Sequence, residues 1–350
     1  MNIYIPTPEI EVLCEVKMKI GGRAQALVVD PRTKQVIERH PWSNNLILNS
    51  GLDMFASKTN GLTGCFRYAA AGYGTSVAAN GQTTLDSERT AGADVDSPVR
   101  SVTYLTGAGN CGTTHVGGSG LYTHRLTHDF SEQLTPQTYA EVGYSDNPAR
   151  DSTLFSRIKL AGSVGVNAGQ QLRTVYDLGV TYSPVTVTAN TPTITGWTTD
   201  GDHCLQEASI WTLDTTGSQV ENNGGVLEPG AFRSSGLTAH NWFVSDVNTA
   251  PTIYEAGGYP NRLVGSSNVN YFQKAVALST YNNGDYYREK VTTFDASEAL
   301  IAAGISAIGI GLGANAGNTL QAWAHVFDDP QPKVNTHRLI LRFRLTWDRV

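Results

Sequence analysis

Apolar and polar residues alternate along most of the chain with the period of two that is typical of half-buried strands. The clearest stretch is "LFSRIKLAGSVGVNAGQQLRTVYDLGVTYSP" (154–184), where two alternating runs flank "VNAGQQ" and predict two strands joined by a turn. Residues 11–20 alternate as well, and one face of that predicted strand carries Val12, Cys14, Val16, Met18 and Ile20. The pattern therefore predicts a protein built mainly from strands.

The first 60 residues predict a hairpin and a short helix. "GGR" (21–23) is expected to turn the chain into "AQALVVD", and "DPRTK" (30–34) is expected to turn it again into the returning strand "QVIERH". In "NNLILNSGLDMFAS", Asn44 or Asn45 can cap a helix, although Gly51 lowers its helix propensity. The apolar residues of this helix would be Leu46, Leu48, Leu52 and Phe55.

Strand-like runs continue to the C-terminus, among them "FRYAAAGYG", "LYTHRLTHDF", "QTYAEVGYS", "NWFVSD", "YYREKVTTF" and "ISAIGIGLG". The polar stretch 86–120 is long for a loop inside a compact domain, so we expect an arm that contacts a neighbouring subunit or protein. A second short helix is predicted over "DASEALIAAG", because Asp295 and Glu298 have the spacing of a capping box and Gly304 can end the helix.

The chain ends on "HRLILRFRLTWDRV", the most regular alternation in the sequence. It predicts a central strand with one apolar face, formed by Leu339, Leu341, Phe343 and Leu345. The opposite face carries Arg338, Arg342 and Arg344, which we expect to lie in water or beside acidic groups.

These elements favour an all-β fold, either an antiparallel β-sandwich or a jelly-roll-like arrangement, with long loops and one or two short helices. Three regions are predicted: 1–60 with the N-terminal hairpin and short helix, 61–190 as a first β region, and 191–350 as a second. The two β regions can also form one continuous domain, since the Pro- and Thr-rich stretch 184–204 between them reads equally well as a loop between strands.

Composition narrows the class of protein. With 350 residues, 16% charged residues and 36 glycines, the chain differs from disordered proteins and suits a β-rich fold. The net charge of −6 argues against sequence-independent binding of nucleic acid, and no motif predicts sequence-specific binding. No secretory signal pattern opens the chain, and no apolar run approaches the roughly 18 residues of a membrane span, so no membrane insertion is expected.

Four cysteines, Cys14, Cys65, Cys111 and Cys204, stand at long and irregular spacings without a C-x-x-C motif. We expect free thiols in place of a zinc or thioredoxin-type site.

Two motifs have the spacing of known binding sites, one for a dinucleotide and one for a metal ion. Gly309, Gly311 and Ala314 form G-x-G-x-x-A with Asp328 downstream, as in dinucleotide-binding proteins, but the sequence continues into a strand where that site needs a helix. His124 and His128 have a metal-binding spacing, but on a strand residues four apart lie about 13 Å from each other and cannot share one ion.

"TTDGDHC" gathers Asp200, Asp202, His203 and Cys204, yet it lacks the order of acids of a calcium loop and is interpreted as a solvated turn. No G-x-S-x-G elbow is present, and paired carboxylates cannot be recognised from sequence because their pairing is spatial. We therefore predict no catalytic, cofactor-binding or metal residues, no cofactor and no enzymatic activity.

The aromatic residues of 281–287, with Trp242, Phe243, Tyr254 and Tyr259, indicate either a sugar- or protein-binding surface or ordinary packing.

"NNLILNSGLDMFA", followed by "FRYAAAGYGTSVA" and "TTLDSE", resembles a pattern common in structural proteins of tailed bacteriophages. The similarity extends to "AEVGYS", "GQQLRTVYDLGV" and the C-terminal strand, and it departs from the usual pattern in 86–120 and in the second half. It implies a non-enzymatic virion component of the tail, neck/collar or fibre, made in the host cytoplasm. Such proteins contact other virion proteins and form symmetric oligomers, here expected to be threefold, sixfold or twelvefold.

Two other functions remain open. The chain can be a virion protein that binds a receptor or a glycan of the host surface, or a carbohydrate-active enzyme on a β scaffold. A glycan array tests the first of these, and depolymerisation of a polysaccharide by the purified protein tests the second.

Overall fold

A computed structural model gives the fold for residues 8–57, 65–92, 98–101, 111–116, 121–182, 192–205, 240–246, 271–275, 277–278, 281–312 and 320–350. This part of the chain is all-β and sandwich-like, with several sheets packed together and a single α-helix, which confirms the predicted fold class. In the same part of the chain, no helix has the length and apolar character that crossing a membrane requires.

The largest sheet has nine strands, and seven of them follow the order β14-β15-β18-β1-β9-β6-β5, while β2 and β10 also pair with β1. Its strands are β1 (Glu9–Val29), β2 (Val36–Asn44), β5 (Cys111–Val116), β6 (Leu121–Glu132), β9 (Gln171–Tyr182), β10 (Thr193–Thr195), β14 (Ala277–Leu278), β15 (Tyr287–Phe294) and β18 (Arg338–Arg349). All three regions expected from the sequence contribute strands to this one sheet.

Two smaller sheets complete the fold. The four-stranded sheet has the order β3-β8-β7-β4, and the five-stranded sheet has the order β11-β17-β16-β12-β13. Their strands are β3 (Leu46–Ile47), β4 (Tyr68–Gly72), β7 (Gln137–Ser145), β8 (Ser156–Val166), β11 (Gly201–Leu205), β12 (His240–Ser245), β13 (Tyr271–Ala275), β16 (Ile305–Leu312) and β17 (Leu320–Gln331).

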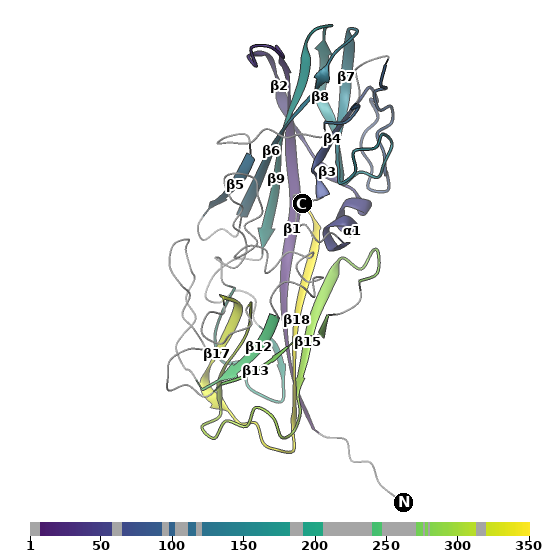
Figure 1. Cartoon of the computed structure of the whole chain (residues 1–350). Coiled ribbons are helices and arrows are strands. Elements are labelled where there is room, and N and C mark those ends of the chain that lie inside the picture. The colour runs from purple at the N-terminus through teal and green to yellow at the C-terminus, as the bar shows by residue number, and fades with distance from the viewer. Residues whose placement is uncertain are drawn as a thin grey trace, which may run out of the picture.

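Strand β1 runs through the whole length of the molecule (Figure 1). Its residues 9–20 pair in parallel with β18, and its residues 18–29 pair in antiparallel fashion with β9. From residue 23 onward, β1 also pairs in antiparallel fashion with β2. The four-stranded sheet lies at one end of β1, and β12, β13 and β17 lie at the other end (Figure 1). One buried apolar cluster contains residues from both ends, including Phe66, Tyr144, Trp242, Trp323 and Phe343. A single strand thus ties two packed halves together.

The predicted turn at "GGR" is wrong, because β1 continues through it as one strand of 21 residues. A Cβ atom at Gly22 would lie 2.6 Å from the backbone oxygen of Asp177 on β9. The glycine is required by the close approach of the two strands and not by a change of direction. The turn at 30–34 and the returning strand β2 are confirmed.

Helix α1 (Asn49–Ser57) begins later than the caps Asn44 and Asn45 would place it, because Leu46 and Ile47 form strand β3. Leu52 and Phe55 are buried as expected. Gly51 has a packing reason: a Cβ atom there would lie 1.9 Å from the backbone oxygen of Phe155. The helix start therefore rests directly on the backbone that precedes β8.

The two strands predicted in 154–184 are confirmed as β8 and β9, with a turn between them. They do not form a hairpin, since β8 belongs to the four-stranded sheet and β9 to the nine-stranded sheet. The turn carries the chain from one layer of the sandwich to the other.

The second predicted helix, over 295–304, is wrong, because these residues form turns. Half of the capping box is present, since the Asp295 amide donates to Oε2 of Glu298 at 2.8 Å. The Nζ of Lys333 donates to the backbone oxygens of Asp295, Ala296 and Glu298 at 2.6–3.2 Å. A helix would use these carbonyls for its own hydrogen bonds, so Lys333 favours the turn conformation.

The described residues of the segment 86–120, predicted to be an arm, pack on the chain's own sheet, and its contact with a neighbouring subunit or protein stays a prediction. Segments 86–92 and 98–101 cover the free edge of β4: the Ser101 amide donates to the Ala69 oxygen at 2.9 Å, and the Arg89 amide donates to the Ala71 oxygen at 3.1 Å. Residues 111–116 form β5, while 93–97, 102–110 and 117–120 lie outside the described residues. Unpaired strand edges favour aggregation, so this segment protects the sheet.

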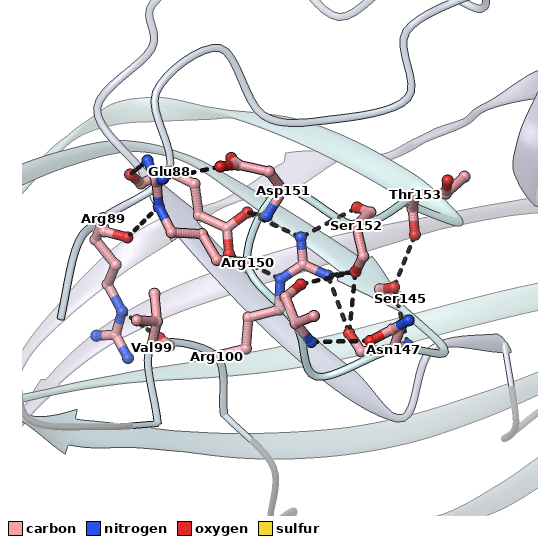
Figure 2. A network of polar contacts seen from close by, with 11 residues as sticks. Glu88, Arg89, Val99, Arg100, Ser145, Asn147, Arg150, Asp151, Ser152 and Thr153 are labelled. Atoms are coloured by element: carbon pink, nitrogen blue, oxygen red, sulfur yellow. Dashed lines mark hydrogen bonds and ion pairs between the residues drawn. The ribbon is translucent and has the colours of Figure 1, made fainter.

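A buried ion pair holds this cover in place (Figure 2). Nε and NH2 of Arg100 donate to the two carboxylate oxygens of Glu88 at 2.7 and 2.8 Å, and both side chains are fully buried. The remaining donors of Arg100 reach the Asn147 oxygen and both oxygens of Ser152, so all five of its N–H groups are used. The Asp151 amide adds a third hydrogen bond to Glu88 at 3.0 Å. The cover is thereby fixed to the loop between β7 and β8.

Strand β18 behaves as predicted: it lies between β15 and β1, and its buried face carries Leu339, Leu341, Phe343, Leu345 and Trp347. Its arginines lie beside acidic groups of the same chain. NH1 of Arg338 lies 3.2 Å from Oε1 of Glu9, and Arg342 forms an ion pair with Glu11. Nε of Arg344 donates to Oε1 of Glu289 at 2.7 Å.

Candidate functional site

A groove of about 240 Å³ lies on the outer face of the nine-stranded sheet, over β2, β1, β9 and β6. Its polar and aromatic lining comes from Gln25, Arg39, Trp42, Arg125, Thr127 and Arg173. Leu27, Val36 and Val175 supply the apolar remainder. No Asp or Glu is among the described residues that line it.

Strand register brings these side chains together. Gln25 on β1 stands opposite Trp42 on β2 and Val175 on β9, and Val175 in turn stands opposite Thr127 on β6. The adjacent row on the same face joins Arg39, Leu27 and Arg173. Alternation sends the intervening residues, such as Ala24, Ala26 and Tyr176, into the core.

Two aspartates behind the groove orient its arginines. Asp177, whose side chain is 4% exposed, accepts from Nε and NH2 of Arg125 at 2.6 and 2.7 Å and from Arg23 at 3.3 Å. The hydrogen bonds to Asp177 raise the pKa of Arg125. Asp129 binds Arg173 in the same two-point manner. Such paired N–H···O bonds fix the guanidinium plane.

Trp42 is the aromatic element of the groove. Its ring lies 4.4 Å from Cζ of Arg23 and 5.8 Å from Cζ of Arg125, both distances being measured to the ring centroid. These are cation–π distances, so the arginines hold the half-buried indole in place.

Several donors and acceptors of the groove are not used within the described part of the chain. NH1 of Arg125 and NH1 of Arg173 make no hydrogen bond there, and Arg39 is exposed with neither a hydrogen bond nor an ion pair. Gln25 donates through Nε2 to the His40 oxygen at 2.8 Å, which leaves Oε1 as an acceptor. Thr127 is 1% exposed, and its buried hydroxyl has no partner among the described residues. The groove can therefore bind a ligand that carries both negative charge and hydroxyl groups.

The two histidines considered as metal ligands in the sequence analysis are buried on β6. His124 and His128 share the inner face of β6, against Phe66 and Tyr144 at ring-centroid distances of 5.5 Å. Burial lowers the pKa of His124 to about 3 and that of His128 to about 4, so both are neutral at pH 7. No group of three or more potential metal ligands occurs in the described ranges.

The glycine motif does not form a dinucleotide site in the described structure. Gly309 and Gly311 lie within β16, which pairs in antiparallel fashion with β17, and Asp328 is an exposed residue of β17. Ala314 lies outside the described residues. In "TTDGDHC", residues 201–205 form β11 and pair with β17; the side chains of Asp202, His203 and Cys204 are outside the described part.

The aromatic residues proposed as a surface are in part core residues. Trp242 is fully buried and packs against Trp323 at 6.2 Å, and Tyr281 packs against Trp347 at 5.7 Å. Tyr287 alone of the described residues in this group is exposed, at 39%. The side chain of Phe243, together with Tyr254 and Tyr259, lies outside the described residues.

Cys14 and Cys65 are free, buried thiols, as predicted, and burial raises the pKa of Cys14. The side chains of Cys111 and Cys204 lie outside the described part of the chain.

Sequence reasoning missed the groove. The available signal was that Arg125, Thr127 and Asp129 alternate with His124, Leu126 and His128 along β6, so that they share the outer face. Alternation alone could not show that Trp42 and Arg39 lie three strands away on the same face.

No known protein family, no curated protein and no solved structure matches the chain.

Proposed function

We propose that the chain is a non-enzymatic structural component of a bacteriophage virion, placed in the tail, neck/collar or fibre and assembled as a symmetric oligomer. The observation that carries this proposal is β1, a 21-residue strand that pairs with β18 over one half and with β9 over the other. The resulting body is elongated, and both halves share one buried cluster (Figure 1). A continuous strand of this length suits a structural subunit whose two ends must stay in a fixed relation.

The covered edge of β4 and two buried ion pairs near it support the same function. Glu88 and Arg100 fix the cover by buried, fully hydrogen-bonded contacts, and a second buried pair, Glu141 and Arg157, holds the neighbouring loop through the Gly74 amide at 2.9 Å. Rigid loops present a defined surface to neighbouring subunits. Strands β5 and β14 end the path of the largest sheet, and symmetric assembly is a common way to cover such edges.

Two measurements test this proposal. Mass spectrometry of purified virus particles should detect the chain in a copy number that is a multiple of three, and light scattering of the purified protein should show an oligomer. Absence of the chain from washed particles would exclude a virion role. A strictly monomeric protein in solution and on the particle would contradict the symmetric assembly.

A second candidate function is binding of a host-surface glycan by the same virion protein, and the groove over β2, β1, β9 and β6 favours it. A glycan array with the purified chain tests this candidate separately from incorporation into particles.

A further inference from the structure

We propose that the groove on the outer sheet face binds an acidic sugar unit, with its carboxylate on the arginines and its hydroxyl groups on Gln25 and Thr127. This inference rests on the glycan-binding candidate and specifies its ligand; it does not depend on the position of the chain in a particle.

Charge selects an anion. Arg39, Arg125 and Arg173 line the groove, and Arg23 lies beside it on β1. Among the described residues, the carboxylates that pair with these arginines are Asp129 and Asp177, on a chain whose net charge is −6. The groove is thus a local positive site on an acidic protein, and such a site attracts anions.

The geometry of the donors selects a carboxylate. Asp177 and Asp129 occupy the Nε and NH2 side of Arg125 and Arg173, so that NH1 of each guanidinium remains available. Arg39 has all of its donors available within the described part of the chain. Planar guanidinium groups bind carboxylates with two parallel hydrogen bonds, and here their planes are already fixed before the ligand arrives.

The other lining groups select a sugar. Oε1 of Gln25 can accept a hydrogen bond from a hydroxyl group, and the hydroxyl of Thr127 lacks a partner in the described part of the chain. Thr127 lines the groove although only 1% of the residue is exposed. Trp42 offers an apolar surface for the C–H face of a ring. A simple inorganic anion would leave the apolar face of Trp42 unused.

Size limits the ligand to one ring. The groove measures about 240 Å³, which is below the roughly 300–1,000 Å³ of sites that enclose drug-sized molecules. On β2 the neighbouring Glu38 and Pro41 are exposed, so the rest of a polysaccharide can continue past the groove over this strand.

Calorimetry on the full chain tests this inference with three probes: a galacturonate oligosaccharide, a neutral galactose oligosaccharide of the same length, and inorganic phosphate. We expect the acidic oligosaccharide to bind, the other two to bind at least about tenfold more weakly, and added salt to weaken the binding. Sialylated and glucuronate oligosaccharides extend the acidic set.

Two variants locate the site. Arg39→Ala removes an exposed arginine without internal contacts and should weaken binding about tenfold or more, because a two-point carboxylate contact is lost. Arg338→Ala removes a partly exposed arginine of β18 that pairs with Glu9, and it should leave binding unchanged. Equal binding of neutral and acidic oligosaccharides, equal binding of phosphate, loss of binding in both variants or in neither, or no binding of any acidic probe would each overturn the proposal.

Discussion

Replacement of Arg100 by alanine should unfold the edge cover of β4. The guanidinium makes five hydrogen bonds, two of them to the fully buried carboxylate of Glu88. After the substitution only the Asp151 amide, at 3.0 Å, still donates to Glu88 among its described partners. Breaking one side of a buried ion pair lowers the free energy of unfolding by about 3–5 kcal/mol, because the other charge stays buried without compensation.

Urea denaturation gives the change in the free energy of unfolding, and hydrogen exchange shows where the structure opens. Exchange should accelerate first in peptides that contain the Ala69, Ala71, Arg89 and Ser101 amides, which hold the cover to β4. Lys19→Ala is the matched control: its ion pair with Asp348 is more than half exposed and should contribute less than about 1 kcal/mol.

A double variant separates charge from packing. Arg100→Met together with Glu88→Leu leaves no buried charge, so it should be more stable than Arg100→Met alone. The reasoning would be refuted by an Arg100→Ala protein that loses less than about 1 kcal/mol, or by exchange that stays slow along the β4 edge.

Three further substitutions test other parts of the fold. Gly51→Ala should destabilise the protein although alanine favours helices by about 1 kcal/mol, because its Cβ would meet the Phe155 oxygen; a higher melting temperature would contradict this. His124→Phe should flatten the acid side of the stability profile. The pKa of His124 is about 3 in the folded protein and about 6.5 in the unfolded chain, so the stability that the neutral imidazole contributes is fully present above pH 6.5. As the pH falls from 6.5 towards 3, the free energy of unfolding of the wild type should decrease by up to about 1.4 kcal/mol per pH unit. Urea midpoints of both proteins at pH 7 and 4.5 measure this effect, and an equal pH-dependent change in the two proteins would count against a neutral buried imidazole. Phe343→Ala should lower the free energy of unfolding by about 3–5 kcal/mol, because the side chain is fully buried. Arg342→Ala should lower it by less than about 1 kcal/mol, because the ion pairs of Arg342 are partly exposed. Truncation before His337 should abolish soluble folding, and a soluble truncated protein of unchanged stability would show that β18 is dispensable.

Alternation identified the strands because burial of one sheet face imposes a period of two. This explains why the faces of β1 and β18 were predicted residue by residue, including Val12, Cys14, Leu341 and Phe343. Alternation does not indicate which strands are neighbours. The parallel pairing of β1 with β18, in a fold whose other described pairs are antiparallel, joins segments more than 300 residues apart and left no local signal.

Long-range contacts explain the remaining errors. Lys333 binds the carbonyls that a helix over 295–304 would have needed, and the Asp177 oxygen explains the glycine that suggested a turn at 21–23. In the polar segment after Asp86, Glu88 and Arg100 are buried because they pair with each other, although polarity of this kind is typical of exposed loops. The groove escaped prediction because Trp42 and Arg125 come from different strands and meet only through register.

The most direct measurement is a reconstruction of purified virus particles at a resolution that shows strands. We expect density for an elongated β subunit, repeated with threefold, sixfold or twelvefold symmetry in the tail, neck or fibre, in which β1 runs through the length of each copy. Particles that lack this density while the protein is present in infected cells would contradict a structural role in the virion.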